Sequence, residues 1–397
     1  MRRTVVQRLC AMYHAKGAEL DYFTDPLGGQ TDSQWDELAD NRFYSSAFWL
    51  RLVALEPGAV SGGIHLNLSG GGRAAVPVAA VADVDDLPNP HLKWPQLLAE
   101  RGLPSPPAHG LLVGQRRGYL AHLLRTPGTD EATVAAALLD AVRSLPLPSA
   151  DGARVALYLT TPDVLALRAA GVRTMPVALA ADAWIEIPQG GWEGWLAARS
   201  GKLRRRIRTE VRRFEEAGYR VERRALPDAY AEVGRLTART EQRYGIPADP
   251  ESYIEGFRKH AELAGDRAEV LLCAVGDEPP VGCILYVRDG DTVYLRAAGF
   301  DYDRLRGVGE YFNLAYYTPA HMPGVRWLHA GIGTPDGKAL RGAELRALWL
   351  LDLTEDSPLL GRDDEVLAHN STFRAQLADM SPVVAGALTE ADWKPFC

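Results

Sequence analysis

The most constraining feature of this sequence is an internal repeat. Residues 161–168 (TPDVLALR) recur 173 positions later as residues 334–341 (TPDGKALR), with six of eight residues identical. Each copy follows an apolar, strand-like run, at residues 155–159 and 325–330. A repeat has to be identified first, because it decides the architecture of the whole chain.

The sequence around the two copies matches as well. The same offset pairs a strand-like segment, 119–124, with 292–297, and a helical segment, 133–142, with 306–315. The order strand, helix, strand, helix therefore occurs twice, in copies long enough to be domains. Because strands and helices are mixed, we expect an α+β fold of two tandem domains, each a mixed β-sheet flanked by helices. The expected domains are residues 1–187 and 188–397.

Composition excludes several classes of protein. The 397-residue chain has a net charge of −7 and four widely separated cysteines, none in a CxxC pair. This pattern is typical of a reducing compartment and offers neither a disulfide framework nor a zinc site. No run of 18 apolar residues is present, so we expect no membrane insertion. The interpretation is a cytoplasmic protein without a bound metal, in which Cys273 and Cys283 pack in the core.

Local signals place most elements. In the first half, Asp32 is the expected N-cap of a helix to residue 43, and residues 86–110 form a long excursion without regular structure. In the second half, Ser200 is the expected N-cap of a helix that Gly218 terminates. The other expected helices are 45–55, 227–244, 251–263, 306–317 and a helix after Lys338, and the other strands are 64–68, 74–81, 219–224, 270–275, 281–287 and 294–300.

One loop carries a candidate binding site. Residues 304–309 (RLRGVG) lie between a predicted strand and a predicted helix. Glycines allow the backbone to approach a ligand closely, and exposed amides at a helix start favour an anion. Arg304 and Arg306 add charge-assisted hydrogen bonds. The matching place in the first half, residues 130–133, has the sequence DEAT, so we expect one working donor site, in the second half.

An RxxGxG loop at this junction resembles the pyrophosphate-binding loop of the GNAT acyltransferases. Nearly the whole chain is similar to tandem-GNAT proteins, namely the Fem-type aminoacyltransferases and the GNAT-like acyltransferases of actinobacterial biosynthetic pathways. The resemblance is carried by residues 35–38, 41–50, 200–207, 214–218, 304–309 and 331–342. It implies transfer of an acyl or aminoacyl group to an amine, without a permanently bound cofactor. The implied donor-binding residues are Phe300, Arg304, Arg306, Gly307, Val308, Gly309 and Lys338.

A basic helix is the second candidate site. Residues 199–224 hold eleven Arg and Lys against four Glu. Arg204, Arg208 and Arg212 are spaced four residues apart and line one face, opposite the apolar stripe. With Arg205, they are candidates for docking a tRNA or an acidic acyl-carrier protein. The alternative is a solvated charged face without a partner.

Amide formation requires a base for the attacking amine. His329, in the strand after the loop helix, is the first candidate, because the histidine pKa suits this work. Glu310 is an alternative base, and Tyr317, next to Tyr316, is a candidate for protonating the leaving group. Each of the three has a structural alternative as a core or hydrogen-bonded residue.

Three functions remain open from the sequence. The first is an N-acyltransferase that moves an acyl group from a phosphopantetheine thioester, acyl-CoA or a carrier protein, to an amine of a small-molecule acceptor. The second is a Fem-type aminoacyltransferase whose donor is aminoacyl-tRNA. The third is a non-catalytic tandem GNAT binding module, against which the intact loop counts.

Overall fold

The computed structural model describes residues 25–397 except 69, 70, 148 and 150. The chain divides into two compact units. Unit 1 comprises residues up to 182 together with 332–336 and 345–397, and unit 2 comprises residues 183–331 and 337–344. Within the described residues, no helix is long and apolar enough to cross a membrane.

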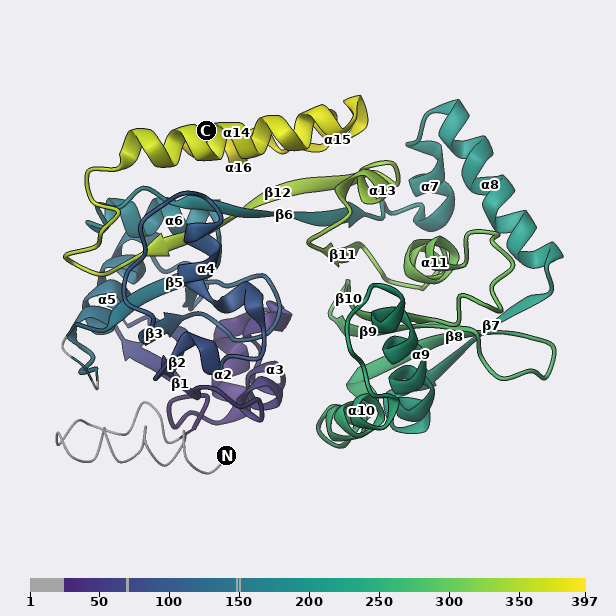
Figure 1. Ribbon diagram of the computed structural model, residues 1–397, viewed down its shortest axis with the longest axis horizontal. Helices are drawn as coiled ribbons and strands as arrows, with labels where there is room; N and C mark the ends of the chain where they lie inside the picture. Colours follow the sequence, from purple (N-terminus) through teal and green to yellow (C-terminus); the bar gives the residue numbers. More distant parts are fainter. Residues whose placement is uncertain (1–24, 69–70, 148, 150) are drawn as a thin grey trace. The chain divides into compact units, whose positions relative to one another are not determined.

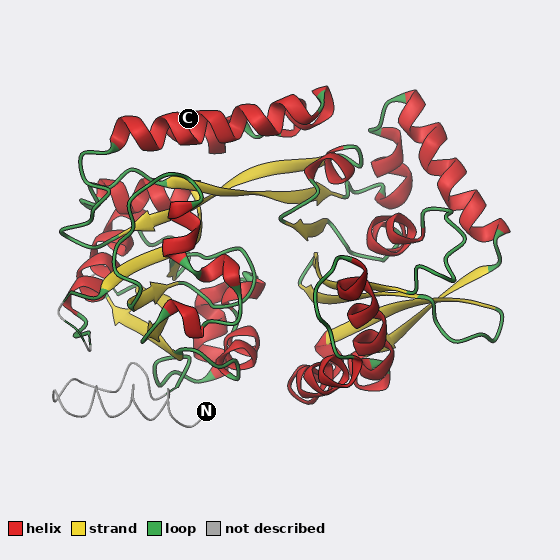
Figure 2. Ribbon diagram, viewed as in Figure 1, coloured by secondary structure: helices red, strands yellow, loops and turns green. Residues whose placement is uncertain are grey.

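Unit 1 is a mixed sheet covered by helices (Figures 1 and 2). Strands β2 and β3 are antiparallel, whereas β3 runs parallel to β5 over four residue pairs, from Gly110↔Ala153 to Val113↔Ala156. The pattern of apolar residues decides the buried faces: all nine residues of β2 except the first are buried. The strands are β1 Val60–Asn67, β2 Arg73–Val81, β3 Gly110–Val113, β4 Leu124–Arg125, β5 Ala153–Thr160 and the end of β12 Ala343–Asp352.

Side-chain caps begin several helices of unit 1, among them α2 and α5. Thr31 caps α2 and forms a capping box with Gln34, and Asp130 caps α5 by accepting from the Thr133 amide. The long helix α14 is fixed by the buried Asn370, whose side chain bonds the backbone of Pro176 and Ala178. The helices are α2 Asp32–Ala39, α3 Ala47–Ala54, α4 Trp94–Ala99, α5 Glu131–Ser144, α6 Thr161–Ala169, α14 Asp363–Met380, α15 Pro382–Ala387 and α16 Glu390–Trp393.

In unit 2 the strands also run in both directions, and β7 to β10 form an antiparallel meander. Strand β11 pairs with β10 in parallel and with the end of β6 in antiparallel fashion. The strands are β6 Val177–Glu186, β7 Tyr219–Ala225, β8 Ala268–Val275, β9 Gly282–Asp289, β10 Thr292–Phe300 and β11 Trp327–Gly331. Strands β6 and β12 both pass from one unit to the other along the chain.

Helices α9 and α10 pack on each other, and α9 packs on β9 and β10 (Figure 1). Gly234 and Gly299 permit these contacts, because an added Cβ on either glycine would lie 2.5 Å from backbone atoms of Ile254 or Leu236. The helices of unit 2 are α7 Gly191–Ala197, α8 Gly201–Glu216, α9 Tyr230–Arg243, α10 Pro250–Ala264, α11 Glu310–Phe312, the π-helix Asn313–Tyr317, α12 Thr318–Ala320 and α13 Pro335–Ala339.

The repeat has a structural counterpart in both units. Its first copy forms α6 directly after β5, and its second copy forms α13 after β11. The predicted caps at the two ends of α8 are confirmed, since Ser200 accepts from the Leu203 amide and Gly218 has a φ of 75°. Cys273 and Cys283 are confirmed as buried core residues.

Several expected elements are wrong. Residues 119–124 are not the parallel partner of β5, because β3 takes that place and only Ala121 bridges to Leu159. The excursion at 86–110 contains helix α4. The N-cap of α2 is Thr31, not Asp32. After Lys338 the chain forms β12, and residues 345–397, expected in the second domain, belong to unit 1.

Candidate active site

Strands β10 and β11 part within unit 2, and this opening is the centre of the candidate site. Their parallel pairing ends at Tyr294↔His329, whereas β10 continues to Phe300. A bulge between Leu295 and Ala297 bends β10 just after the last pair. Residues 295–298 are half-buried, while the flanking residues of β10 are buried. The opening therefore presents a partly exposed strand edge.

The direction of the backbone amides along this edge follows from strand alternation. Phe300 N–H bonds the hydroxyl of Thr240 at 2.8 Å, so it points away from β9, and the Asp301 amide points toward β9, since it bonds Val281 O at 2.8 Å. Because neighbouring residues alternate, Ala298 N–H lies on the same edge as Phe300 N–H, beyond the last pair with β11. The edge amide placed to meet a ligand is that of Ala298; the Phe300 amide, expected to contact the donor, is already bonded.

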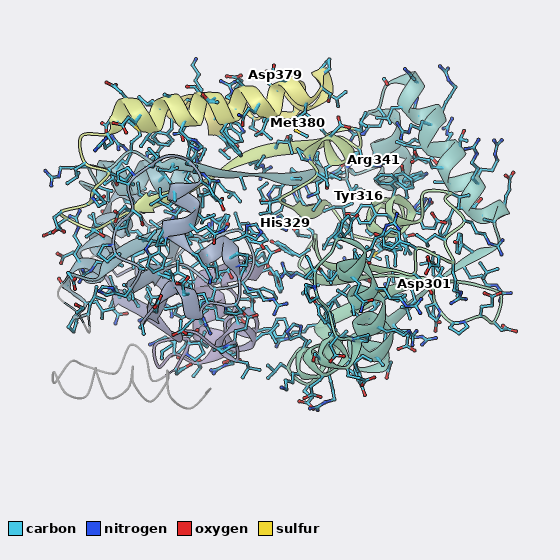
Figure 3. All side chains as sticks on the ribbon, in the orientation of Figure 1. Asp301, Tyr316, His329, Arg341, Asp379 and Met380 are labelled. Carbon is cyan, nitrogen blue, oxygen red and sulfur yellow. The ribbon has the colours of Figure 1, made fainter. Side chains whose placement is uncertain are left out.

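His329 lies at the vertex of the opening, in the last pair before the strands part (Figure 3). Its side chain is 1% exposed. The imidazole lies between two aromatic rings, with ring centroids 4.7 Å from Trp184 and 5.3 Å from Tyr294. Its position relative to the open edge agrees with a role in transfer, whereas its burial means that a proton must reach it from the edge.

The loop at 304–309 folds around a carboxylate of the chain itself. Glu310 accepts three consecutive backbone amides: Arg306 N at 2.8 Å, Gly307 N at 2.9 Å and Val308 N at 3.1 Å. Tyr219 Oη donates a fourth bond at 3.0 Å. Positive φ angles of 70° at Gly307 and 84° at Gly309 allow the loop to curl in this way.

Two expectations are corrected by this geometry. Glu310 is 4% exposed and both carboxylate oxygens accept bonds from the loop, so it is not placed to accept a proton from a substrate. The loop amides expected to hold a donor phosphate are already bonded to Glu310. Both arginines are exposed, but their side chains have protein partners: Arg304 pairs with Glu278 at 2.8 Å and Arg306 Nη1 bonds Ala217 O at 2.5 Å.

A second network, centred on the half-buried Glu210, joins α8 to the helical segment after the loop. Glu210 of α8 accepts from Tyr317 Oη, from Arg206 Nε at 2.9 Å and from Arg341 Nη2 at 3.2 Å. The Arg341 guanidinium, 2% exposed, also lies 3.2 Å from the ring centroid of Phe312. Burial raises the pKa of Tyr317, and its hydroxyl hydrogen is committed to Glu210. Tyr317 is therefore a weaker acid than an exposed tyrosine, which argues against proton donation to a leaving group.

Neighbouring candidates have different surroundings. Tyr316 is buried, with its hydroxyl 3.4 Å from that of Tyr311, and burial raises its pKa too. Lys338 is 3% exposed and its Nζ donates to Gly331 O at 2.8 Å. Lys338 thus holds the end of β11, one side of the opening, and its role toward a donor stays a prediction.

The outer face of α8 is strongly cationic. Arg205, Arg208 and Arg212 are exposed. Arg212 lies 3.6 Å from Glu216, whereas Arg205 and Arg208 have no acidic partner within the described part of the chain. Arg204 turns inward and donates to the carbonyls of Ala197 and Arg199 at 2.9 and 3.1 Å. Of the four predicted docking arginines, three present charge to solvent.

Three residues of this region were missed by sequence reasoning. Glu210 gives no signal, because a Glu among the arginines of a basic helix looks like a surface ion-pair partner. Tyr219 opens a strand and resembles an ordinary core residue. Ala298 contributes only its backbone, which a residue type cannot reveal.

Comparisons with known proteins concern the family and the fold. Residues 201–338 match the family model described as acetyltransferase (GNAT) domain. The fold is similar to that of FemX, with a TM-score of 0.57 and 13% identity over 82% of this chain and 96% of FemX. It is also similar to the C-terminal domain of a putative lysylphosphatidylglycerol synthetase from Agrobacterium fabrum, with a TM-score of 0.51 and 11% identity over 86% and 96% of the two chains. A search of curated protein sequences finds no match.

These findings confirm the expected fold class: an α+β chain with two tandem GNAT-like domains, each a mixed sheet flanked by helices. At such low identity, the structural likenesses concern the fold alone.

Proposed function

Since residues 201–338 match the family model of the GNAT acetyltransferase domain, we propose that the chain is an acyltransferase that moves an aminoacyl group from a charged tRNA to an amine of a small molecule. The observation that carries this proposal is the free edge of β10 beside His329, in a unit whose helix α8 presents unpaired arginines. The free edge provides a place for the reacting carbonyl, and the helix provides a surface for a polyanionic carrier.

The transfer chemistry follows from the groups at the opening. The acceptor amine attacks the ester carbonyl, and the carbonyl oxygen gains negative charge. The amide of Ala298 points outward from the free edge and donates to that oxygen. A fixed donor of this type stabilises a tetrahedral intermediate. His329 accepts the proton that the amine loses. The carbon–oxygen bond to the ribose then breaks, and the ribose oxygen takes up the proton that His329 accepted from the amine.

The charge of α8 favours a nucleic-acid carrier over free acyl-CoA. Unpaired arginines bind phosphates through charge-assisted forks, and such binding weakens steeply as salt rises. Free acyl-CoA would instead need the amides of residues 306–308, and these are bonded to Glu310. Glu210 connects this helix directly to Tyr317 and Arg341, so a carrier docked on α8 sits on an element that contacts the site.

A phosphopantetheine thioester on a carrier protein is the second candidate donor. The specific observation in its favour is the same free edge of β10, whose backbone groups also suit the amides of a pantetheine arm. An acidic carrier protein would meet the same arginines.

Binding and transfer measurements separate these donors. The protein is titrated with fluorescent total aminoacyl-tRNA, acetylated carrier protein and acetyl-CoA, and release of the labelled aminoacyl group to a panel of small amines is followed. We expect saturable, salt-dependent binding of aminoacyl-tRNA and release only when an amine is present. Binding of the carrier protein alone would establish the second candidate. Binding without transfer to any amine would indicate a non-catalytic module.

A charge-reversal variant tests the docking surface. Arg205→Glu, Arg208→Glu and Arg212→Glu together should weaken tRNA binding by about tenfold or more at low salt, because several phosphate contacts are lost. The control places the same three reversals on the exposed residues Arg173, Lys259 and Arg362, which lie on other elements. Equal losses in both variants would show that net charge, not α8, is responsible.

A further inference from the structure

The amides of the RxxGxG loop form a small anion-binding nest. Arg306, Gly307 and Val308 direct three consecutive N–H groups at one carboxylate, and the Tyr219 hydroxyl completes the set. Concave runs of backbone amides of this kind bind phosphates in many proteins. Here the anion is the carboxylate of Glu310, the residue directly after the loop, whose exposed fraction is only 4%.

Each amide of the nest has an acceptor, but the space beside the loop backbone is open. A Cβ built on Gly307 would meet no atom within 4 Å, so space exists beside the backbone. What the nest lacks is a free donor, because each of its three amides already has an acceptor. The arginines that could add charge are turned to Glu278 and to Ala217 O.

We propose that Glu310 determines the donor class of this enzyme by occupying the place that a diphosphate would take. A diphosphate would have to displace a bonded carboxylate, leave that carboxylate without its four donors, and tolerate its negative charge nearby. The loop is therefore closed to donors that carry a pyrophosphate, and open to donors held elsewhere. This inference rests on the proposed function in one respect, namely that the natural donor has no pyrophosphate.

Tyr219 strengthens the closure. Burial raises its pKa to about 12, so the hydroxyl remains protonated at neutral pH. It donates to Glu310 and also accepts from Arg306 N at 3.1 Å. The Glu310 carboxylate, the Tyr219 phenol and the loop backbone thus bond one another. Rotation of the Arg304 or Arg306 side chain would break none of these hydrogen bonds.

The decisive experiment removes the carboxylate. Wild type, Glu310→Ala and Glu310→Gln are titrated with inorganic pyrophosphate and with CoA by calorimetry, and thermal unfolding is recorded with and without each anion. We expect no saturable binding to wild type. Glu310→Ala should unfold at a lower temperature, bind pyrophosphate at least tenfold more tightly than wild type, and recover much of the lost stability when pyrophosphate is present. Sodium chloride at equal ionic strength should not restore it.

A matched control frees charge without opening the nest. Glu278→Ala releases Arg304 from its ion pair but leaves Glu310 in place, so it should gain no pyrophosphate affinity. Should Glu310→Ala fail to fold, Glu310→Gln keeps the side-chain volume, and its stability should still rise selectively with pyrophosphate. The inference is overturned if wild type binds pyrophosphate or CoA as tightly as Glu310→Ala does, if both folded Glu310 variants gain nothing, or if Glu278→Ala gains as much.

The tRNA assay distinguishes this inference from the proposed function. Glu310→Ala should bind aminoacyl-tRNA as wild type does, since α8 is untouched. If wild type binds no aminoacyl-tRNA, the proposed donor is contradicted. The result that pyrophosphate replaces the Glu310 carboxylate would not be affected. Failure of the anion exchange would leave the tRNA result as it stands.

Discussion

The two units treat the opening beside their parallel strands in opposite ways. In unit 1, the chain after β3 returns to β5: Ala121 N–H bonds Tyr158 O at 2.9 Å, and Ala121 bridges to Leu159. In unit 2, β11 ends near the vertex and the edge of β10 beyond Tyr294 is left unpaired by it. Unit 1 thus closes the opening with its own chain, whereas unit 2 leaves it open, which is why we place the proposed site in unit 2.

The units also differ in how they supply an anion to the helix that follows. Asp130 caps α5 in unit 1 as an exposed residue, bonded to the amide and hydroxyl of Thr133. Glu310 in unit 2 is buried and holds three amides and a phenol. In both units a carboxylate of the chain occupies the helix start at which a donor phosphate would bind. The absence of a free phosphate site is therefore common to both units and does not indicate which of them carries the transfer site. The open strand edge does.

The largest expected effect comes from a proline pair at the two openings. Ala298→Pro removes the edge amide proposed to stabilise the oxyanion, so kcat should fall by about 10²- to 10³-fold. The protein should stay folded, because this N–H takes no part in the ladder with β9. Ala121→Pro deletes the bond to Tyr158 and should lower the unfolding temperature instead. Steady-state transfer rates and thermal unfolding of both variants make the check, with Ala298→Gly, which retains the amide, as the control.

An unchanged kcat in folded Ala298→Pro would show that the Ala298 amide at the open edge takes no part in the transfer reaction. A rate loss of similar size in Ala121→Pro, with stability intact, would show that unit 1 is not merely a scaffold.

The next effect concerns the vertex residue. His329 pairs with Tyr294 in unit 2, and the corresponding last pair in unit 1 is Val113↔Ala156. Converting His329 to the residue of unit 1, His329→Ala, should lower kcat by about 10²-fold with KM nearly intact, because the proton acceptor is lost. The low-pH limb of the rate profile should move, and added imidazole should restore part of the rate. A loss of stability with normal turnover would instead make this histidine a packing residue.

The smallest effect compares the two arginines of the repeat. Arg341 is buried and holds Glu210, Gly337 O and the ring of Phe312, so Arg341→Leu should reduce the free energy of unfolding by about 2 kcal/mol, since these contacts are lost while Arg206 and Tyr317 still bond Glu210. Arg168 bonds only Thr174 O at 2.5 Å among the described residues, and Arg168→Leu should cost about 1 kcal/mol. Urea denaturation of both variants measures the difference; equal values would mean that the repeat preserved one structural role.

Local signals explain why much of the fold could be predicted. The α8 helix has a polar cap at Ser200, an apolar stripe and a terminating glycine, and all of these act within one turn of the chain. The repeat located α6 and α13 because both follow a strand of a parallel pair. The segment at 119–124 was misassigned because a constant offset was assumed. Thirty-five residues separate Tyr294 from His329, whereas 43 separate Val113 from Ala156, and the extra residues carry the segment that closes the opening.

The site itself depended on partners that are distant in sequence. The loop motif correctly marked a turn with positive φ angles, but a pattern of glycines and arginines cannot show that the next residue, Glu310, folds back onto the amides. The one available signal was an acidic residue within reach of an amide nest. Likewise, Glu210 and Arg341 are 131 positions apart, and nothing in either local sequence indicates that they meet.

The passage of β12 out of unit 2 has a consequence for biosynthesis. Residues 345–397 complete the first unit, with β12 pairing along β5 and Asn370 bonding the segment at Pro176. On the ribosome, the second unit's residues up to 331 emerge while β5 still has a bare edge, and bare edges invite association with other chains. The part of the chain that is translated first is thus the last to be completed, and a polypeptide cut short after the candidate site would lack the residues that complete unit 1.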